Sequence, residues 1–198
     1  DKYVGFIKVG KFYKKVNKTH KVSVLKSKIY SKPLSRYGKK KFLPFSSEIE
    51  ILEKKNNFAM FEKNKWVRIN ELEIIKKRNI DFAKILKLFL DCKYKWGGKS
   101  FDGIDCSALL QIFYKFNNKF FPRDTIDQVK IKKGVIKKKV FKKGDIIFWK
   151  GHVAICLNSN NLIHAYGPRK KVLIMPINKT IKLIEKTAHL KISKVISI

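Results

Sequence analysis

The sequence predicts an α+β chain in which a small all-β barrel precedes a larger domain of helices followed by an antiparallel sheet. Three observations support this prediction. Short strand-like segments separated by Pro, Gly and Asn fill the first third of the chain. A helical pattern with one apolar face follows, and beyond Gly134 the pattern becomes strand-like again. Helices and strands segregated along the sequence are typical of the α+β class.

The expected parts of the chain are residues 1–17, 18–76 and 77–198. The middle part holds the barrel, whose expected strands cover residues 22–30, 48–53, 58–61 and 66–69. The alternation of polar and apolar residues is clearest at residues 48–51, where Glu and Ile give one solvent-exposed and one apolar face. With Trp66 near its closing strand, this part resembles a bacterial SH3-like module. The sequence of residues 1–17 resembles the end of that module, and we expect these residues to be the tail of an earlier SH3-like module.

Helices open the third part. The first is expected over residues 82–90, with Asn79 or Asp81 as its N-terminal cap. The second is expected over residues 108–116, immediately after Cys106, and a short third helix follows Pro122-Arg123-Asp124.

The rest of the chain predicts an antiparallel sheet. Its expected strands cover residues 145–149, 152–157, 162–165 and 172–177, with a last strand in the tail 191–198. The polar residues 158–161 predict a turn that joins two neighbouring strands.

The net charge of +32 does not indicate a nucleic-acid partner. Only five of the 47 basic residues are arginine, and lysine is spread through every segment instead of forming one patch. We therefore expect solvated lysines, with weak attraction to anionic polymers as a side effect. There is no apolar run long enough to cross a membrane and no signal peptide in the sequence. Because it starts at Asp1 and not at Met, we expect a fragment or a processed product.

Cysteine is sparse, and three widely spaced cysteines do not suggest a disulfide framework. Cys92 and Cys156 are expected to be small buried residues. Cys106 differs, because it lies where a helix begins. The unpaired backbone N–H groups and the positive dipole at that point are expected to favour its thiolate.

Two histidines complete a candidate site. His152 and His164 lie on strands that we expect to be antiparallel neighbours, so their imidazoles should lie side by side. A cysteine nucleophile needs a base and a group that orients the base, and these three residues supply that set. His152 is the expected base and His164 the orienting residue.

The same three residues could have another role. A zinc site formed by one Cys and two His is the main alternative, but it lacks a fourth ligand and the usual Cys-x-x-Cys or His-x-x-x-His spacing. We expect no metal and no cofactor. His20 and His189 lie outside the motifs and are expected at the surface.

Five blocks of sequence resemble, in order, the motifs of the NlpC/P60 family of cell-wall peptidases over roughly residues 79 to 178. The blocks are Tyr94-x-Trp96-Gly97-Gly98, residues 103–107, Pro122-Arg123-Asp124 with Gln128, residues 143–155 and residues 162–165. One departure is Ala108, where the family usually has glycine.

The resemblance implies a papain-like fold and a cysteine endopeptidase. Its substrate would be the bond from γ-D-glutamate to meso-diaminopimelate or L-Lys in peptidoglycan stem peptides, especially short muropeptides with a free N-terminal L-Ala. Cys106, His152 and His164 would be catalytic. Tyr94 would stabilise the oxyanion with the Cys106 backbone N–H. Asp105 and Ser107 would hold the substrate's amino terminus, or would simply cap the helix.

Two other functions remain open from the sequence. One is a non-catalytic peptidoglycan-binding protein, and the other is a different papain-like enzyme such as an amidase or acyltransferase. Reduced thiols and the muropeptide-trimming motifs favour a cytoplasmic enzyme, with export left open. The sequence gives no expectation for the oligomeric state.

Overall fold

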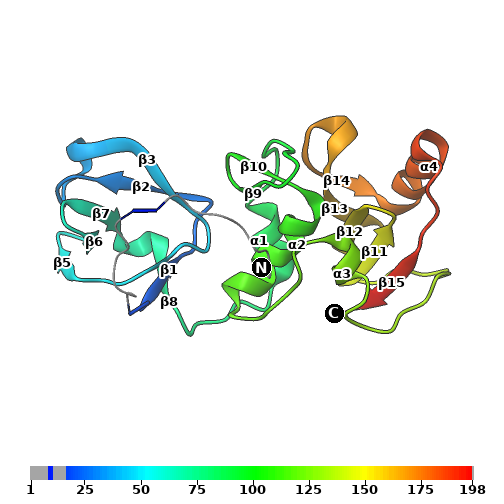
Figure 1. Cartoon of the computed structure of the whole chain (residues 1–198), viewed down its shortest axis with the longest axis horizontal. Helices are drawn as coiled ribbons and strands as arrows, with labels where there is room; N and C mark the ends of the chain where they lie inside the picture. The colour runs from blue at the N-terminus through cyan, green and yellow to red at the C-terminus, as the bar shows by residue number, and fades with distance from the viewer. Residues whose placement is uncertain (1–8, 11–16, 198) are drawn as a thin grey trace. The chain divides into compact units, whose positions relative to one another are not determined.

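The computed structural model describes residues 9–10 and 17–197, and the chain divides into two compact units between Lys77 and Arg78 (Figure 1). The strand expected within residues 1–17 therefore falls outside the described residues, apart from residues 9, 10 and 17. No helix among the described residues is long and apolar enough to cross a membrane.

The described residues of the amino-terminal unit form two antiparallel sheets. One has the order β4-β1-β8 and the other the order β3-β2-β7-β6-β5. The strands are β1 (His20–Val22), β2 (Lys26–Tyr30), β3 (Gly38–Pro44), β4 (Glu48–Ile49), β5 (Glu53–Lys55), β6 (Phe58–Glu62), β7 (Lys65–Arg68) and β8 (Leu72–Ile74). Single-turn 3-10 helices cover Ser35–Tyr37 and Ile69–Glu71. Val22, Ala59 and Val67 are fully buried.

The strand expected over residues 22–30 is interrupted. Both the backbone N–H and the hydroxyl of Ser23 donate to the carbonyl oxygen of Glu71, at 2.9 and 3.0 Å. The chain therefore leaves one sheet after β1 and enters the other at β2. β3 and β8 were not expected. Gly38 and Pro44 stand at the two ends of β3, so they bound a strand and do not mark a loop.

The carboxy-terminal unit contains a five-stranded antiparallel sheet of order β14-β13-β12-β11-β15 (Figure 1). Its strands are β11 (Asp145–Trp149), β12 (His152–Cys156), β13 (Asn161–Tyr166), β14 (Lys171–Pro176) and β15 (Lys194–Ser197). All five expected strands are confirmed. Every residue of β11 is buried, which explains why the four residues after Asp145 are all apolar and do not alternate with polar ones.

Four helices belong to this unit: α1 (Phe82–Lys87), α2 (Cys106–Phe116), α3 (Thr125–Gln128) and α4 (Ile177–Ala188). Two very short strands, β9 (Lys99–Ser100) and β10 (Gly103–Ile104), precede α2, and a 3-10 helix covers Gly167–Arg169. α1 is shorter than expected, because its last turns tighten into i→i+3 bonds before Asp91 adopts a left-handed φ of 62°.

α4 was missed from the sequence. It buries Ile177, Thr180 and Ile184, a spacing of three and four residues, among lysines on its other faces. Ile177 and Ile184 join Ile147, Trp149 and other residues of the sheet in one apolar core cluster. α2 packs against β12 and β13, so the start of α2 lies near the strands that carry the two histidines.

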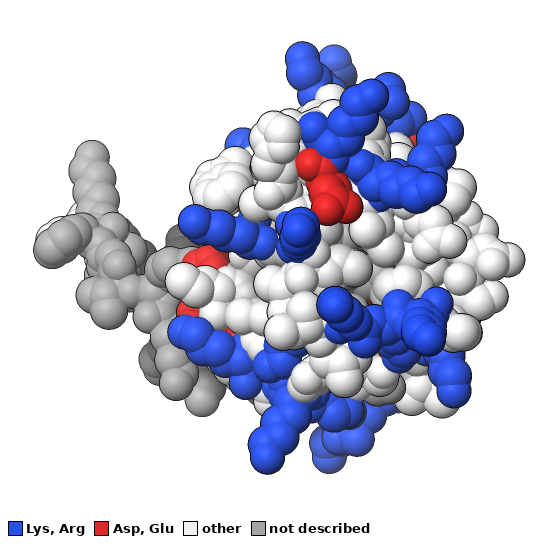
Figure 2. Space-filling view, turned by 90° about the vertical axis from the view of Figure 1, so that its right-hand side faces the viewer, with Lys and Arg blue, Asp and Glu red and all other residues white. Residues whose placement is uncertain are grey.

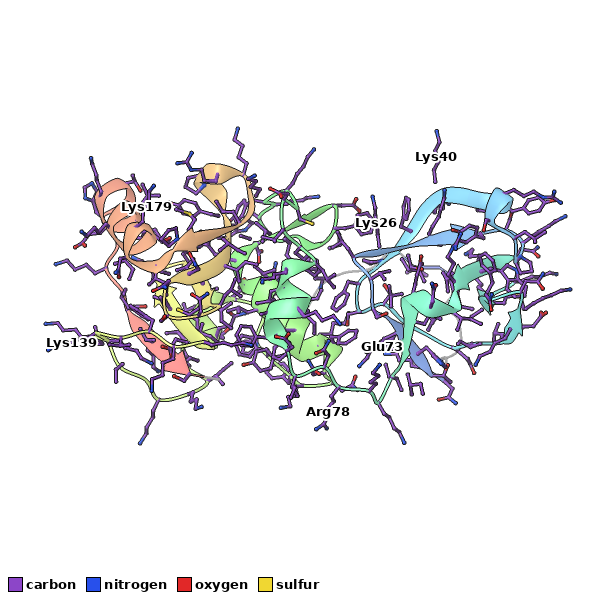
Figure 3. All side chains as sticks on the ribbon, turned by 180° about the vertical axis from the view of Figure 1, so that it is seen from behind. Lys26, Lys40, Glu73, Arg78, Lys139 and Lys179 are labelled. Carbon is purple, nitrogen blue, oxygen red and sulfur yellow. The ribbon has the colours of Figure 1, made fainter. Side chains whose placement is uncertain are left out.

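Most lysines are solvated, as expected, but Lys21 is not: it is 1% exposed, and its ammonium group donates to the carbonyl oxygens of Ile75 and Lys77. Lys and Arg side chains are spread over the face shown in Figure 2, with few acidic side chains between them. In Figure 3, Lys40 of the amino-terminal unit and Lys139 of the carboxy-terminal unit project away from the ribbon, and both are exposed.

Candidate active site

Cys106 is the first residue of α2, as the sequence predicts. Asp105 is the N-cap: its backbone is extended, and its Oδ1 accepts a hydrogen bond from the Ala108 N–H at 2.8 Å. The cap fixes the direction of the first helical turn. The Cys106 side chain is almost buried, with 6% of its surface exposed.

The two histidines lie side by side on β12 and β13. His152 Nε2 and His164 Nδ1 are 3.0 Å apart, a hydrogen-bonding distance. His164 is 1% exposed, and its Nε2 lies 3.4 Å from Met175 Sδ. The expected pairing of the two imidazoles is therefore confirmed. Because Nε2 of His152 is used by His164, Nδ1 is the ring nitrogen left to act as a base.

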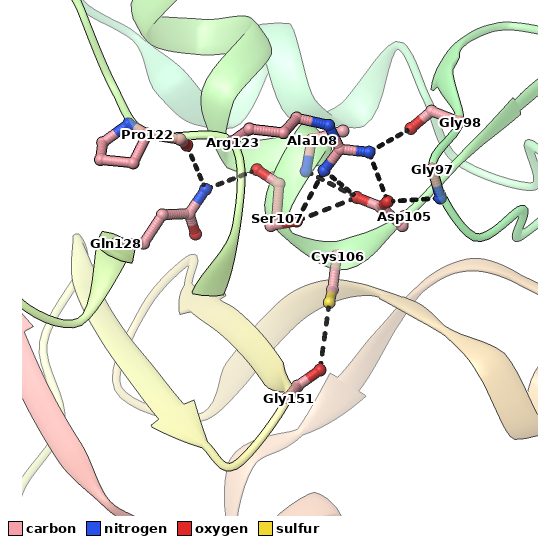
Figure 4. Close-up of polar contacts among 10 residues, drawn as sticks. All are labelled: Gly97, Gly98, Asp105, Cys106, Ser107, Ala108, Pro122, Arg123, Gln128 and Gly151. Atoms are coloured by element: carbon pink, nitrogen blue, oxygen red, sulfur yellow. Dashed lines mark hydrogen bonds and ion pairs between the residues drawn. The ribbon is translucent and has the colours of Figure 1, made fainter. Parts of the chain in front are cut away.

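The thiol of Cys106 is flanked by the residues on both sides of His152. Its Sγ lies 4.0 Å from the carbonyl oxygen of Gly151 (Figure 4), and the Val153 backbone N–H donates to it. Gly151 has a φ of 75°, the left-handed conformation that glycine adopts without strain. That conformation allows a two-residue turn between the paired residues Trp149 and His152.

Burial makes the resting site neutral. It raises the pKa of the Cys106 thiol to about 11, although the backbone N–H of Val153 opposes the shift. The N–H groups of Cys106 and Ser107 at the helix start lower the pKa, as expected, but loss of water outweighs them, so the thiol of the resting protein stays protonated at neutral pH. Burial also lowers the pKa of His152 to about 4 and that of His164 to about 3, with the charge of His152 adding to the second shift. At neutral pH both imidazoles are unprotonated.

These shifts predict that the protein loses stability in mild acid. An unfolded imidazole titrates near 6.5. Below that pH the unfolded chain therefore binds more protons than the folded chain, and the free energy of unfolding falls until the folded pKa values near 4 and 3 are passed. We expect urea unfolding at pH 7.5 and 4.5 to show a lower unfolding free energy at pH 4.5. His164→Gln should reduce that difference, whereas an unchanged difference would contradict the assignment.

Tyr94 lies close to the thiol. Burial raises the pKa of its hydroxyl, and electrostatic interaction with ionised Cys106 and with Asp105 raises it further. Its backbone N–H donates to the carbonyl oxygen of Lys170 at 2.8 Å, and its ring packs against Gly167. The structure thus brings Tyr94 together with Cys106.

Asp105 and Ser107 belong to a buried network with Arg123 (Figure 4). Arg123 Nη1 donates to Asp105 Oδ1 at 2.9 Å and Nη2 donates to Oδ2 at 2.5 Å. Oδ2 also accepts from the Gly97 N–H at 2.9 Å, and Arg123 Nη1 donates to Ser107 Oγ at 2.8 Å. Both carboxylate oxygens and the hydroxyl are thus committed to protein partners, which favours the capping role over binding of a substrate ammonium group.

Sequence reasoning missed the role of Arg123. Its side chain is 9% exposed, and its bidentate contact joins the loop before α3 to the start of α2. Gln128 adds to this by donating to the carbonyl oxygens of Ser107 and Pro122, both at 2.9 Å. A signal was available: Arg123 is one of only five arginines in a lysine-rich chain.

The remaining cysteines and histidines lie elsewhere. Cys156 is fully buried in the sheet core, as expected, but Cys92 is only half-buried. His189 is exposed, whereas His20 is half-buried beside Thr19, at 2.9 Å from its hydroxyl. In the described part of the chain, no three His, Cys, Asp or Glu side chains form a group that could hold a metal ion.

A cavity of about 490 Å³ opens beside His152. Its walls come from Tyr94, the turn between β11 and β12, the end of β13, the 3-10 helix Gly167–Arg169 and the second half of α4. The site therefore has open space next to the candidate base.

A buried cysteine at a helix start, beside a histidine pair on an antiparallel sheet, is an arrangement typical of the cysteine hydrolases. A sequence model of the NlpC/P60 family matches residues 91–189, which is half of the chain. The protein belongs to the NlpC/P60 family.

Individual relatives agree with this assignment. The chain is 33% identical to a Bacillus cereus gamma-D-glutamyl-L-lysine dipeptidyl-peptidase, over 57% of this chain and 38% of the relative. It is 31% identical to a probable endopeptidase NlpC homolog of Haemophilus influenzae, over 59% of this chain and 63% of the relative. The crystal structure of an NlpC/P60 family protein from Bacillus cereus superposes with a TM-score of 0.71 at 25% identity, covering 89% of this chain and 62% of that one. The chain thus spans less than two thirds of the length of each of these relatives.

Proposed function

We propose that the protein is a cysteine peptidase that hydrolyses the bond between γ-D-glutamate and meso-diaminopimelate or L-Lys in peptidoglycan stem peptides. The observation that carries the proposal is the thiol of Cys106 set against the backbone on both sides of His152, whose Nε2 is held by His164 at 3.0 Å. Family membership and the names of the Bacillus relatives support the choice of bond. Their description as dipeptidyl-peptidases supports short substrates with a free N-terminal L-Ala.

In the proposed reaction, Nδ1 of His152 accepts the Cys106 proton as the sulfur attacks the γ-glutamyl carbonyl carbon. The oxygen of that carbonyl becomes negative and receives hydrogen bonds from the Cys106 backbone N–H and the Tyr94 hydroxyl. The carbon–nitrogen bond then breaks, and His152 gives its proton to the leaving α-amine. Water, deprotonated by His152, attacks the thioester and releases the acid, and the thiol recovers its proton.

The neutral resting site fits this sequence of steps. An unprotonated His152 is ready to accept a proton, and a protonated Cys106 has one to give. The proton of Cys106 then moves to His152 as the sulfur attacks the carbonyl carbon, so the thiolate forms only when it reacts. In this proposal Asp105, Ser107 and Arg123 act by fixing the start of α2 and not by touching substrate.

We also propose that the amino-terminal unit is an SH3-like module that precedes the catalytic domain. The eight short strands among its described residues, arranged in two antiparallel sheets, support this.

Identification of the products by mass spectrometry tests the proposed function. We expect L-Ala-γ-D-Glu-meso-diaminopimelate, or its L-Lys counterpart, to yield L-Ala-γ-D-Glu and the free diamino acid, with no effect of a chelator. The N-acetylated peptide should be cleaved more slowly. Cleavage at another bond would point to a different papain-like activity, and no cleavage of either peptide would favour a binding role.

A further inference from the structure

The cavity beside His152 has a defined position relative to the proposed reaction. None of the residues that line it belongs to α2 or to the Asp105–Arg123 network. It is instead bounded by Lys150, Gly151 and His152 on one side and by Tyr94 on another. At about 490 Å³ it falls in the usual range for small-ligand sites, about 300–1,000 Å³.

The proposed mechanism determines which half of the substrate can occupy the cavity. If the proposed function holds, His152 must deliver its proton to the amine that leaves, so that amine lies against His152. The residue that carries the amine then extends into the open space that borders His152. The cavity is therefore on the leaving-group side, where the diamino acid would lie.

The lining of the cavity combines apolar walls with positive charge. Tyr166, Ile184 and Leu190 give it buried or half-buried apolar surface. Lys150 and Arg169 are exposed at its edge, and no acidic residue lines it. Neither cation forms an ion pair with another of the described residues, unlike Lys171, which pairs with Asp91 at 2.6 Å. Both charges are available to an anionic ligand.

Of the two cations Lys150 and Arg169, Arg169 gives the clearer indication of what the cavity binds. Lysine is spread through the whole sequence, whereas only five residues are arginine. One of these five, Arg123, already forms a bidentate pair with the carboxylate of Asp105. Arginine presents a planar fork that fits a carboxylate with two parallel hydrogen bonds. Arg169 ends the 3-10 helix Gly167–Arg169, in which Gly167 packs against the Tyr94 ring. The guanidinium thus extends from a turn that is packed against the site.

We propose that this cavity is a leaving-group subsite for a diamino acid whose α-carboxylate is free, with Arg169 as the residue that recognises the carboxylate and Lys150 in support. The inference deepens the proposed function and rests on it. It makes peptides that end at the diamino acid the preferred substrates, over peptides in which that carboxyl group is blocked.

Matched substrates test the subsite. We expect kcat/KM for L-Ala-γ-D-Glu-L-Lys to exceed that for its C-terminal amide by about ten- to a hundredfold, the worth of a hydrogen-bonded charge. Arg169→Gln should remove most of this preference by lowering kcat/KM for the acid alone, and Lys150→Gln should have a smaller effect. Arg78→Gln, which removes an exposed arginine outside the cavity, should keep the preference. Equal rates for acid and amide in the wild type, or an unchanged preference in Arg169→Gln, would overturn the proposal.

A binding measurement separates this proposal from the proposed function. Free L-lysine, added to ¹⁵N-labelled Cys106→Ala protein, should shift the amide resonances of Gly167, Arg169 and Thr187, and L-lysinamide should not. If neither tripeptide is hydrolysed but L-lysine produces these shifts, the proposed function fails and the anion subsite stands. If L-lysine and L-lysinamide give the same result, the subsite is contradicted whether or not the tripeptides are cleaved.

Discussion

Replacing Cys106 with alanine is expected to lower kcat/KM by at least about four orders of magnitude, the usual result of removing a covalent nucleophile. The reason is chemical, since no neighbouring group can form the thioester. The fold should persist, because alanine is smaller, favours the helix and leaves the Asp105 cap intact. Hydrolysis rates and circular dichroism of the variant check both statements.

The matched control is Cys92→Ala, which removes a half-buried thiol that lies outside the site. This variant should keep the wild-type rate. A Cys106→Ala protein that still hydrolyses the tripeptide, or a Cys92→Ala protein that does not, would contradict the role given to Cys106.

Replacing Arg123 with leucine is expected to reduce the free energy of unfolding by about 3–5 kcal/mol. The guanidinium makes a bidentate contact with Asp105, and both side chains are less than a tenth exposed. Without it, the carboxylate is left buried and unpaired at the start of α2, where it also accepts the Gly97 and Ala108 N–H groups. Urea unfolding measures the loss.

Two controls sharpen this test. Asp105→Asn combined with Arg123→Leu should recover part of the lost stability, because asparagine still caps the helix but carries no charge. Lys171→Gln breaks a more exposed ion pair, with Asp91, and should cost at most about 1 kcal/mol. If Arg123→Leu costs no more than Lys171→Gln, the Asp105–Arg123 pair does not hold the site together.

The elements of the candidate site were predictable because they depend on local sequence. Cys106 stands between a capping aspartate and an apolar helical pattern, and the fold places it at the first position of α2. His152 and His164 flank a polar turn between apolar runs, so their pairing on adjacent strands follows from the hairpin. These local patterns can be interpreted without knowing which distant segments of the chain are in contact.

What could not be predicted depends on contacts between distant segments. The Asp105–Arg123 pair joins residues from different loops, and the break at Ser23 arises from a contact with Glu71. The raised pKa of the Cys106 thiol also arises this way, because burial by surrounding elements outweighs the helix start. α4 is a different case. Its apolar spacing was present in the sequence but lay among lysines on its other faces.

The central claim is that Cys106 attacks the γ-glutamyl carbonyl of an L-Ala-γ-D-Glu acyl group. Labelling with the chloromethyl ketone of L-Ala-γ-D-Glu tests it most directly, because the thiol displaces chloride and forms a stable carbon–sulfur bond. Intact-protein and peptide mass spectrometry should show one adduct per chain, located on Cys106, and no adduct in Cys106→Ala. Labelling of Cys92 or Cys156 instead, or wild-type protein that stays unlabelled while it hydrolyses the tripeptide, would contradict the account.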